Sequence, residues 1–328
     1  MRRSLALALL VLFAMFTWAR ADRPLKSRDL RVVVRPVALA RHADPDFHLG
    51  AFRLEGAWQL ASRWSNFGSY SALLAMPDGT FLAFSDSGTY LRFSPPDTRR
   101  KILMGGDLLS GYPMAKTGRD VESATRDPKS GRIWLGVEWS NSVVRLARDL
   151  RPAGKERPSS IRRWGENSGP EAMVRLSDGR FVLLREAFAG WFESRRHDAV
   201  VFEGDPVAKA RSWHFVFEGP EGFCPTDMTE LPDGRVLILM RKLVWPAPQR
   251  FAGRLAIADP RDIRPGKPWT ARTVARIASS LPVDNFEGIA VLPAPAGRLA
   301  VWIISDDNVS SFQRTILWKL SVDPGALP

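Results

Sequence analysis

Cysteine is nearly absent from this 328-residue chain, and the single one, Cys224, excludes an intrachain disulfide and a cysteine-rich metal site. Histidine is also scarce: His42, His48, His197 and His214 are the only four, and none lies beside a Ser–Asp pair suited to a catalytic triad. A G-x-S-x-G motif is missing as well. Nucleophilic catalysis is therefore not indicated, and Cys224 is expected to be a buried, inert thiol.

Long apolar runs are absent except at the N-terminus, where residues 5–18 are almost wholly apolar. Two arginines precede this run, and Ala19-Arg20-Ala21 follows it as an A-x-A cleavage pattern. This layout predicts a secretory signal peptide over residues 1–21, and the alternative is an uncleaved N-terminal anchor. We therefore expect a periplasmic or secreted protein with no membrane span after cleavage. It would consist of an N-terminal extension (22–48) and one domain (49–325).

Acidic residues are the less common charged residues: the chain has 35 of them against 47 lysines and arginines, which gives a formal net charge of +12. The excess is spread along the chain without a run of five basic residues. A basic surface favours anionic partners, but this dispersed pattern does not favour nucleic acid. A small anionic or ester substrate and a monomeric protein are expected.

Helical periodicity is almost missing, and a repeat of two apolar strands around a tight glycine turn takes its place. Glycine at such turns supplies the positive φ that a hairpin requires. The five copies are SALLAMPDGTFLAFSD (71–86), ESATRDPKSGRIWLGVE (122–138), EAMVRLSDGRFVLLRE (171–186), TDMTELPDGRVLILMR (226–241) and EGIAVLPAPAGRLAVWIISD (287–306).

The turn glycines of the five copies lie 52, 48, 55 and 63 residues apart. This spacing predicts an all-β fold, a single β-propeller with one four-stranded sheet per blade. A sixth blade would join FRLEGAWQLAS (52–62) to the C-terminal strand RTILWKLSV (314–322). Six blades, sealed by pairing the N- and C-terminal strands, are therefore predicted. A β-sandwich is the alternative, but it does not predict so regular a repeat.

Acidic residues recur where each hairpin is farthest from its turn, which places them on one rim of the propeller. Counting eight residues back from the turn glycine reaches Ser71 in the first copy, Glu171 in the third, and Thr226 followed by Asp227 in the fourth. Glu122 and Glu287 occupy the equivalent place if the longer turns of the second and fifth copies absorb one and two extra residues. The predicted inner ring is Glu122, Glu171, Asp227 and Glu287. Just outside it we expect Asp86, Glu138, Glu186, Asp306 and Asp307, interspersed with Arg185, Arg241 and Lys242.

Carboxylates gathered around a narrow opening repel one another unless protons, arginines or a cation compensate them. Oxygen ligands without histidine or cysteine suit Ca²⁺, or another divalent cation such as Mg²⁺, and no organic cofactor is indicated. The predicted metal ligands are Glu122, Glu171, Asp227, Glu287, Asp306 and Asp307. The alternative is that each acid bonds a backbone amide or an arginine and only fixes the register of the blades.

The same segments resemble the phytase-like propellers described as "esterase-like activity of phytase". The likeness extends from FGSYSALLAMPDGTFLAFSDSG (67–88) to DNFEGIAV…WIISDDNVSSFQRTILWKL (284–320), nearly the whole mature chain. It implies an exported six-bladed propeller of phytase or esterase type. One departure concerns Asp86, because Ser85-Asp86-Ser87-Gly88 lacks the arginine of the usual S-D-R-G, which weakens a phosphate clamp.

Two functions are compatible with these residues. The first is a hydrolase of phosphate or carboxylic esters, in which a cation polarises the ester and acidic residues act as ligands or general base. Its catalytic residues would be Glu171, Glu287 and Arg241, and its substrate-binding residues would be Arg185, Lys242, Glu138 and Asn308. The second is a non-enzymatic propeller that binds a sugar, a peptide or an envelope partner. A lactonase-type metal propeller is a weaker third alternative.

Overall fold

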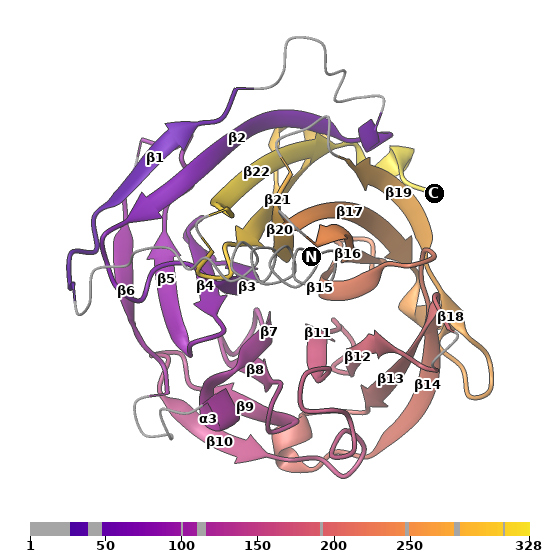
Figure 1. The fold of residues 1–328 in the computed structure, drawn as a ribbon. Coiled ribbons are helices and arrows are strands. Elements are labelled where there is room, and N and C mark those ends of the chain that lie inside the picture. The colour runs from indigo at the N-terminus through magenta and orange to yellow at the C-terminus, as the bar shows by residue number, and fades with distance from the viewer. Residues whose placement is uncertain are drawn as a thin grey trace, which may run out of the picture.

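The computed structural model describes residues 27–38, 48–99, 101–109, 116–190, 193–246, 249–278, 283–310 and 312–328. The predicted signal peptide (1–21) and its cleavage site lie outside these residues. The described strands form five sheets, antiparallel except for one short parallel pair, arranged radially around a central axis, so the fold is a five-bladed β-propeller (Figure 1). The expectation of an all-β propeller is confirmed, and the expectation of six blades is wrong.

The first two blades each contain four strands in consecutive order. Blade 1 consists of β3 (Tyr70–Ala75), β4 (Phe81–Ser85), β5 (Thr89–Phe93) and β6 (Leu103–Asp107). Blade 2 consists of β7 (Val121–Arg126), β8 (Ile133–Val137), β9 (Ser142–Leu146) and β10 (Pro152–Glu156), and the short helix α3 (Lys116–Arg119) precedes it.

In the next two blades, one strand from the chain segment of blade 4 joins the sheet of blade 3. Blade 3 consists of β11 (Pro170–Arg175), β12 (Phe181–Phe188), β13 (Arg196–Phe202), β14 (Ser212–Glu218) and β18 (Trp269–Thr270). Blade 4 consists of β15 (Cys224–Glu230), β16 (Val236–Pro246), β17 (Gln249–Ala258) and β19 (Arg272–Ile277). The two-residue β18 leaves the chain of blade 4 and pairs in parallel with β14, which ties blade 4 to blade 3.

Blade 5 is built from both ends of the chain and closes the ring. Its strands, from the axis outward, are β20 (Asn285–Pro293), β21 (Leu299–Asp306), β22 (Thr315–Val322), β2 (Arg53–Ser62) and β1 (Val32–Pro36). The predicted pairing of 52–62 with 314–322 is confirmed, since Trp58 lies opposite Leu317. These strands complete the fifth hairpin and do not form a blade of their own. β1 falls in the stretch 22–48, which was predicted to precede the domain.

The hydrophobic core is divided into five clusters, one between each pair of neighbouring blades. Each blade presents both faces to a neighbour, so alternate residues of one strand enter different clusters. In β16, Leu237 and Leu239 pack toward blade 5, whereas Ile238 and Met240 pack toward blade 3. Within the described ranges, short 3₁₀ helices lie between strands at η1 (Pro206–Ala208), η2 (Pro260–Asp262) and η3 (Pro295–Gly297), and η4 (Pro324–Ala326) follows β22.

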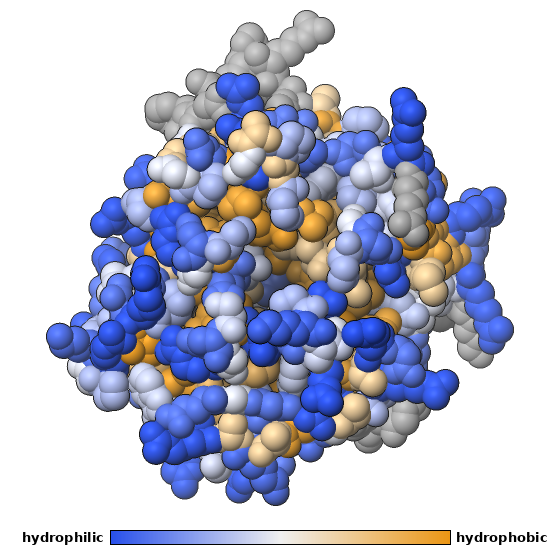
Figure 2. Space-filling model, turned by 180° about the vertical axis from the view of Figure 1, so that it is seen from behind, coloured by the Kyte–Doolittle hydropathy of each residue, from blue (hydrophilic) through white to orange (hydrophobic). Residues whose placement is uncertain are grey.

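The outer surface contrasts with this apolar interior. Hydrophilic side chains cover most of the face seen in Figure 2, and hydrophobic atoms are visible between them. Among the described residues, no helix has the length and apolar character that crossing a membrane requires.

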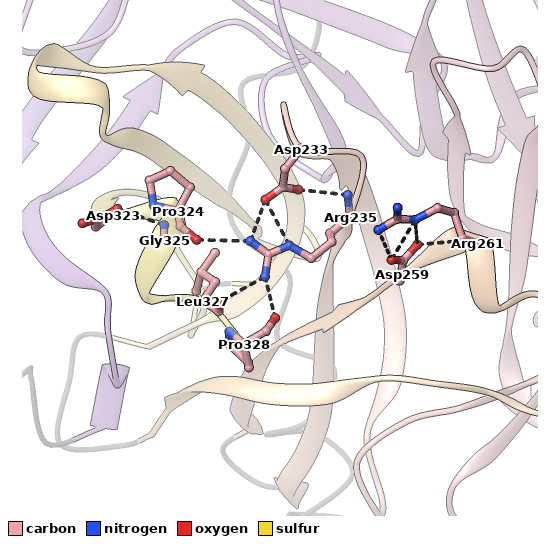
Figure 3. A network of polar contacts seen from close by, with 9 residues as sticks. All are labelled: Asp233, Arg235, Asp259, Arg261, Asp323, Pro324, Gly325, Leu327 and Pro328. Atoms are coloured by element: carbon pink, nitrogen blue, oxygen red, sulfur yellow. Dashed lines mark hydrogen bonds and ion pairs between the residues drawn. The ribbon is translucent and has the colours of Figure 1, made fainter.

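The C-terminal segment is held against the β15–β16 turn by one arginine (Figure 3). Arg235 donates from Nη2 to the carbonyl of Pro324 at 3.1 Å and from Nη1 to the carbonyl of Leu327 at 3.0 Å. The same side chain forms an ion pair with Asp233. Arg235 therefore links blade 4 to the residues that follow β22 of blade 5.

Replacing Arg235 by alanine is expected to lower the free energy of unfolding by about 2 kcal/mol, because several backbone carbonyls and one carboxylate lose a charged donor together. Urea unfolding measures this loss. Arg261→Ala is the matched control, since Arg261 is 80% exposed and pairs with Asp259, and its loss should stay below about 1 kcal/mol. Equal losses in the two variants would contradict the linking role of Arg235.

Candidate functional site at one mouth of the propeller axis

Each inner strand carries a β-bulge at the same position near its start. In β3 the pairing shifts between Tyr70 and Ala72, and in β7 it shifts between Val121 and Ser123. A bulge leaves one residue out of the ladder and re-aims its side chain. The five bulged residues are Ser71, Glu122, Glu171, Thr226 and Glu287. We call them the bulge ring.

A second set of polar residues stands beside the bulge ring, at the far ends of the second strands. Register places them together, since Ser85 pairs with Tyr70 just before Asp86, and Arg185 pairs with Pro170 just before Glu186. The five equivalent residues are Asp86, Glu138, Glu186, Arg241 and Asp306. We call them the second ring. Both rings therefore lie at the end of the propeller axis where the inner strands begin, and these inner strands surround the centre in Figure 1.

The carboxyl groups of the two rings interact across blades. Burial raises the pKa of Glu122 well above its ordinary value, and the charges of Glu287, Asp120 and Asp86 raise it further. Burial likewise raises the pKa of Asp306 well above its usual range, with further contributions from Glu287 and Asp86. These groups belong to blades 1, 2 and 5, so the rim gathers carboxylates that are costly to ionise together.

Arg241 is the only basic residue among the ten positions of the two rings, all of which the structure describes. Its guanidinium forms ion pairs with Glu287 at 2.8 Å and with Glu186 at 2.9 Å. It also donates to Oδ1 of Asn285 at 2.9 Å, and Asn285 in turn donates to Glu287 at 2.7 Å. Burial opposes the charge of Arg241, but Glu287, Glu186 and Glu171 together raise its pKa. Arg241 thus holds two carboxylates in fixed positions.

Glu138 and Glu171 form a carboxyl pair between blades 2 and 3, and Glu171 is near enough to Arg241 for their charges to interact. Both are buried, at 7% and 6% exposure. Burial raises the pKa of Glu138 to about 7, although hydrogen bonds from the Gly169 amide (3.1 Å) and with Glu171 oppose this shift. Burial and the neighbouring Glu186 and Glu122 raise the pKa of Glu171 well above its usual range. One proton shared within this pair is consistent with these directions.

Two overlapping groups of carboxylates have the spacing of a cation site. Within each group, one oxygen per residue lies within 4.8 Å of the others. The groups are Asp120–Glu122–Glu138 and Glu138–Glu171–Glu186. Because all these ligands are hard oxygens and the groups share Glu138, they fit a divalent cation such as Ca²⁺. Among the described residues, these groups contain two of the predicted metal ligands, Glu122 and Glu171.

The other predicted metal ligands occupy different settings. Glu287 is held by Arg241, and Asp306 accepts a hydrogen bond from the Asn308 amide at 2.7 Å. Asp227 follows the bulged Thr226, and its two oxygens accept from the backbone amides of Met228 and Ile289, both at 2.8 Å. The bond from Ile289 joins blade 4 to blade 5.

Asp307 has a similar setting at the last junction of the ring. Its Oδ1 accepts from the Ser69 amide at 3.2 Å, and its Oδ2 accepts from Thr315 at 3.1 Å. Ser69 precedes blade 1, whereas Thr315 belongs to blade 5. For Asp227 and Asp307, the observed contacts are those of the alternative in which acids fix the blade register.

The predicted substrate-binding side chains are only partly at the rim. Glu138 lies in the second ring, whereas Arg185 pairs with Asp198 of β13 at 3.0 Å. Lys242 is exposed, with its ammonium 5.9 Å from the centre of the Phe223 ring. Asn308 is exposed and donates to Gln313 at 2.7 Å.

Asp120 and Asn285 at the rim were not predicted from the sequence, whereas Glu186 was expected just outside the inner ring without an assigned role. Asp120 directly precedes β7, and Asn285 is the first residue of β20. The signal was present in RDVES and DNFEG, where a polar residue stands two positions before the bulged glutamate. Only the bulge shows that this second position also reaches the rim.

Cys224 lies beside this site without the character of a nucleophile. Burial raises the pKa of its thiol to about 12, and Glu186 contributes in the same direction. The thiol is therefore protonated at neutral pH, as expected of an inert cysteine, but Cys224 is half-buried and not fully buried as predicted.

Comparisons with solved structures return chains of low similarity. A chain of the nidogen/laminin complex has 7% identity and a TM-score of 0.44, over 87% of this chain and 97% of that one. A luciferin-regenerating enzyme has 9% identity and a TM-score of 0.42, over 77% and 92%. Hydrazine synthase of Kuenenia stuttgartiensis has 13% identity and a TM-score of 0.38, over 77% and 71%. None of these likenesses bears on the chemistry of the rim.

The family comparison is more specific. No curated protein matches the chain. The model of the phytase-like family matches residues 65–309, a range that contains every position of the two rings. This match spans more than half of the sequence and agrees with the resemblance seen in the repeat. The chain therefore belongs to the phytase-like family, described as "Esterase-like activity of phytase".

Proposed function

We propose that this protein is an exported hydrolase of phosphate or carboxylic esters that works with a divalent cation, Ca²⁺ by preference, at the carboxylate-lined mouth. The observation that carries the proposal is the pair of overlapping carboxylate groups around Glu138, each with oxygens within 4.8 Å of one another. The family description supports the reaction class. The basic overall charge supports an anionic substrate.

In this proposal, some residues of the rim bind the cation and another transfers the proton. Asp120, Glu122, Glu138, Glu171 and Glu186 would hold the cation. When bound, a divalent cation polarises an ester or phosphoryl oxygen and lowers the pKa of water. Carboxyl groups must lose their protons to bind a cation, so the raised pKa values of Glu122, Glu138 and Glu171 make cation binding stronger at higher pH.

Glu287 is the candidate general base of this site. Its Oε1 accepts from Arg241 and from Asn285, which fixes the carboxylate in one orientation. Burial raises its pKa above the ordinary glutamate value, which brings it nearer to the value suited to proton transfer at neutral pH. Arg241 acts on this group as a positioning residue, because its donors are engaged by Glu287, Glu186 and Asn285.

Phosphate-ester and carboxylic-ester substrates, assayed with Ca²⁺ and with EDTA, test this proposal. Activity should require the metal and fall at least about tenfold in Glu171→Gln, because one charged ligand is lost. The matched control is Glu203→Gln, which alters a glutamate paired with Arg211 away from the rim. An inert wild type, or equal activity in all three proteins, would reject the hydrolase in favour of a propeller that only binds a partner.

A further inference from the structure

The opposite end of the propeller axis holds a cavity whose chemistry differs from that of the acidic rim. It has a volume of about 220 Å³ and is lined by residues of all five inner strands. Four residues beyond each bulge, the strands present a ring that we call the far ring. Its members are Ala75, Arg126, Arg175, Glu230 and Val291, and all five line the cavity. Four residues of strand separate the two rings by about 13 Å.

Where the structure describes the chain, two of the three charged side chains in the far ring have polar partners, and the third has a buried donor without one. The carboxylate of Glu230 accepts from the Ser177 amide at 2.8 Å and from its hydroxyl at 2.9 Å. Arg175 forms an ion pair with Asp127 at 3.4 Å. In contrast, Nε of Arg126 is buried and has no hydrogen-bond partner among the described residues. A buried donor of this kind is costly unless a ligand or solvent satisfies it.

The surroundings of Arg126 favour an anion as that ligand. Burial lowers the pKa of Arg126, the adjacent Asp127 opposes this, and the positive charge of Arg148 adds to it. Asp127 is itself occupied, because it accepts from the hydroxyl of Ser130 and pairs with Arg175. Thr125 and Thr229 also line the cavity. An oxyanion could take two donors of the planar Arg126 guanidinium at once, as phosphate commonly does.

We propose that this cavity is a phosphate-binding site centred on Arg126, separate from the carboxylate-lined mouth. The ligand is a phosphate oxyanion, either inorganic phosphate or the phosphate group of a small ester. The site needs no cation, because its own guanidinium groups supply the positive charge. It therefore stands whether or not the mouth hydrolyses esters.

Isothermal titration calorimetry with the full chain in EDTA tests this site, with inorganic phosphate in one arm and glycerol phosphate in the other. Wild type should bind at least one of the two compounds saturably. The compound that binds more tightly shows whether the site takes inorganic phosphate or the phosphate group of an ester. Arg126→Gln should weaken that binding at least about tenfold, because a charged bidentate contact is lost. Arg272→Gln, an exposed arginine of β19, is the matched control and should bind as wild type does. Glu171→Gln should also bind unchanged.

Absence of saturable binding by wild type, or equal affinity in Arg126→Gln, would overturn the site. Weakening by Arg272→Gln as large as that by Arg126→Gln would also overturn it, since overall charge would then be the cause. Circular dichroism establishes whether Arg126→Gln folds. If it does not, Arg126→Lys replaces it, because lysine keeps the charge and loses the planar fork. Affinity should then fall at least about threefold, and an unchanged affinity would reject the proposal.

Discussion

The metal-free protein is expected to be more stable at pH 5 than at pH 8. Burial, with the charges of Asp120 and Glu186, raises the pKa of Glu138 from 4.5 to about 7. Between these two pH values the folded protein binds more protons than the unfolded chain, so the free energy of unfolding falls as pH rises. For Glu138 alone the loss is about 3 kcal/mol. The raised pKa values of Glu122 and Glu171 act in the same direction.

Urea unfolding in EDTA at pH 5, 6, 7 and 8 measures this dependence. Glu138→Gln should flatten the profile, because an amide has no proton to lose in this range. Surface carboxylates with lowered pKa values, such as Asp78, lose their contribution only below the ordinary aspartate pKa and leave this window unaffected. Adding Ca²⁺ at pH 8 should restore stability by binding the folded state. A wild-type profile that rises from pH 5 to pH 8 would contradict the prediction.

Replacing Arg241 by methionine is expected to cost about 3 kcal/mol of folding free energy at pH 8. Methionine keeps the unbranched apolar stem but removes the donors to Glu287, Glu186 and Asn285. The side chain of Glu287 is only 7% exposed, so it would remain buried without its cation. The loss should be smaller at pH 5, because Glu287 can then take up a proton.

Arg185→Met is the matched control for Arg241→Met. Arg185 lies near the same rim but pairs with Asp198, whose side chain is 41% exposed. Its removal should therefore cost at most about 1 kcal/mol at either pH. Chemical unfolding of the two variants at pH 5 and pH 8 gives the comparison. A loss in Arg241→Met that is the same at both pH values would show that Glu287 does not respond to the missing charge.

The hairpin repeat was sufficient to predict the propeller and most of its acidic rim. Turn glycines fix the register of each hairpin, so a count of eight residues back identified Ser71, Glu171 and Thr226, all of which are bulged residues. Glu122 and Glu287 were found by allowing for longer turns. The count succeeded because side-chain position in an antiparallel pair depends only on distance from the turn.

The number of blades could not be obtained in this way. The fifth hairpin, β20–β21, is followed by only one further strand, β22, before the chain ends. β2 and β1 complete its sheet by pairing across the two chain ends. From the sequence, these strands could equally be assigned to a sixth blade, because strand pairing distant in sequence leaves no local pattern.

The difference between Thr226 and Asp227 shows the same limit on a smaller scale. The sequence favours Asp227 for the inner ring because it is the acid, but the bulge falls on Thr226. Asp227 then accepts the Ile289 amide of the next blade, a partner that only the closed ring brings near. Likewise, the repeat predicted which residues lie on the rim. The ion pairs of Arg241 with Glu287 and Glu186 depend on the packing of blade 4 between blades 3 and 5.

The sequence by itself determined the strand periodicity, the turns and the end of each hairpin on which the acids lie, because these depend on contacts between near neighbours in the chain. Tertiary structure decided the blade count, the partner of each carboxylate and the separation of an acidic mouth from the arginine-bearing far ring. These features arise where five inner strands distant in sequence approach one axis, so they depend on contacts that no single repeat contains.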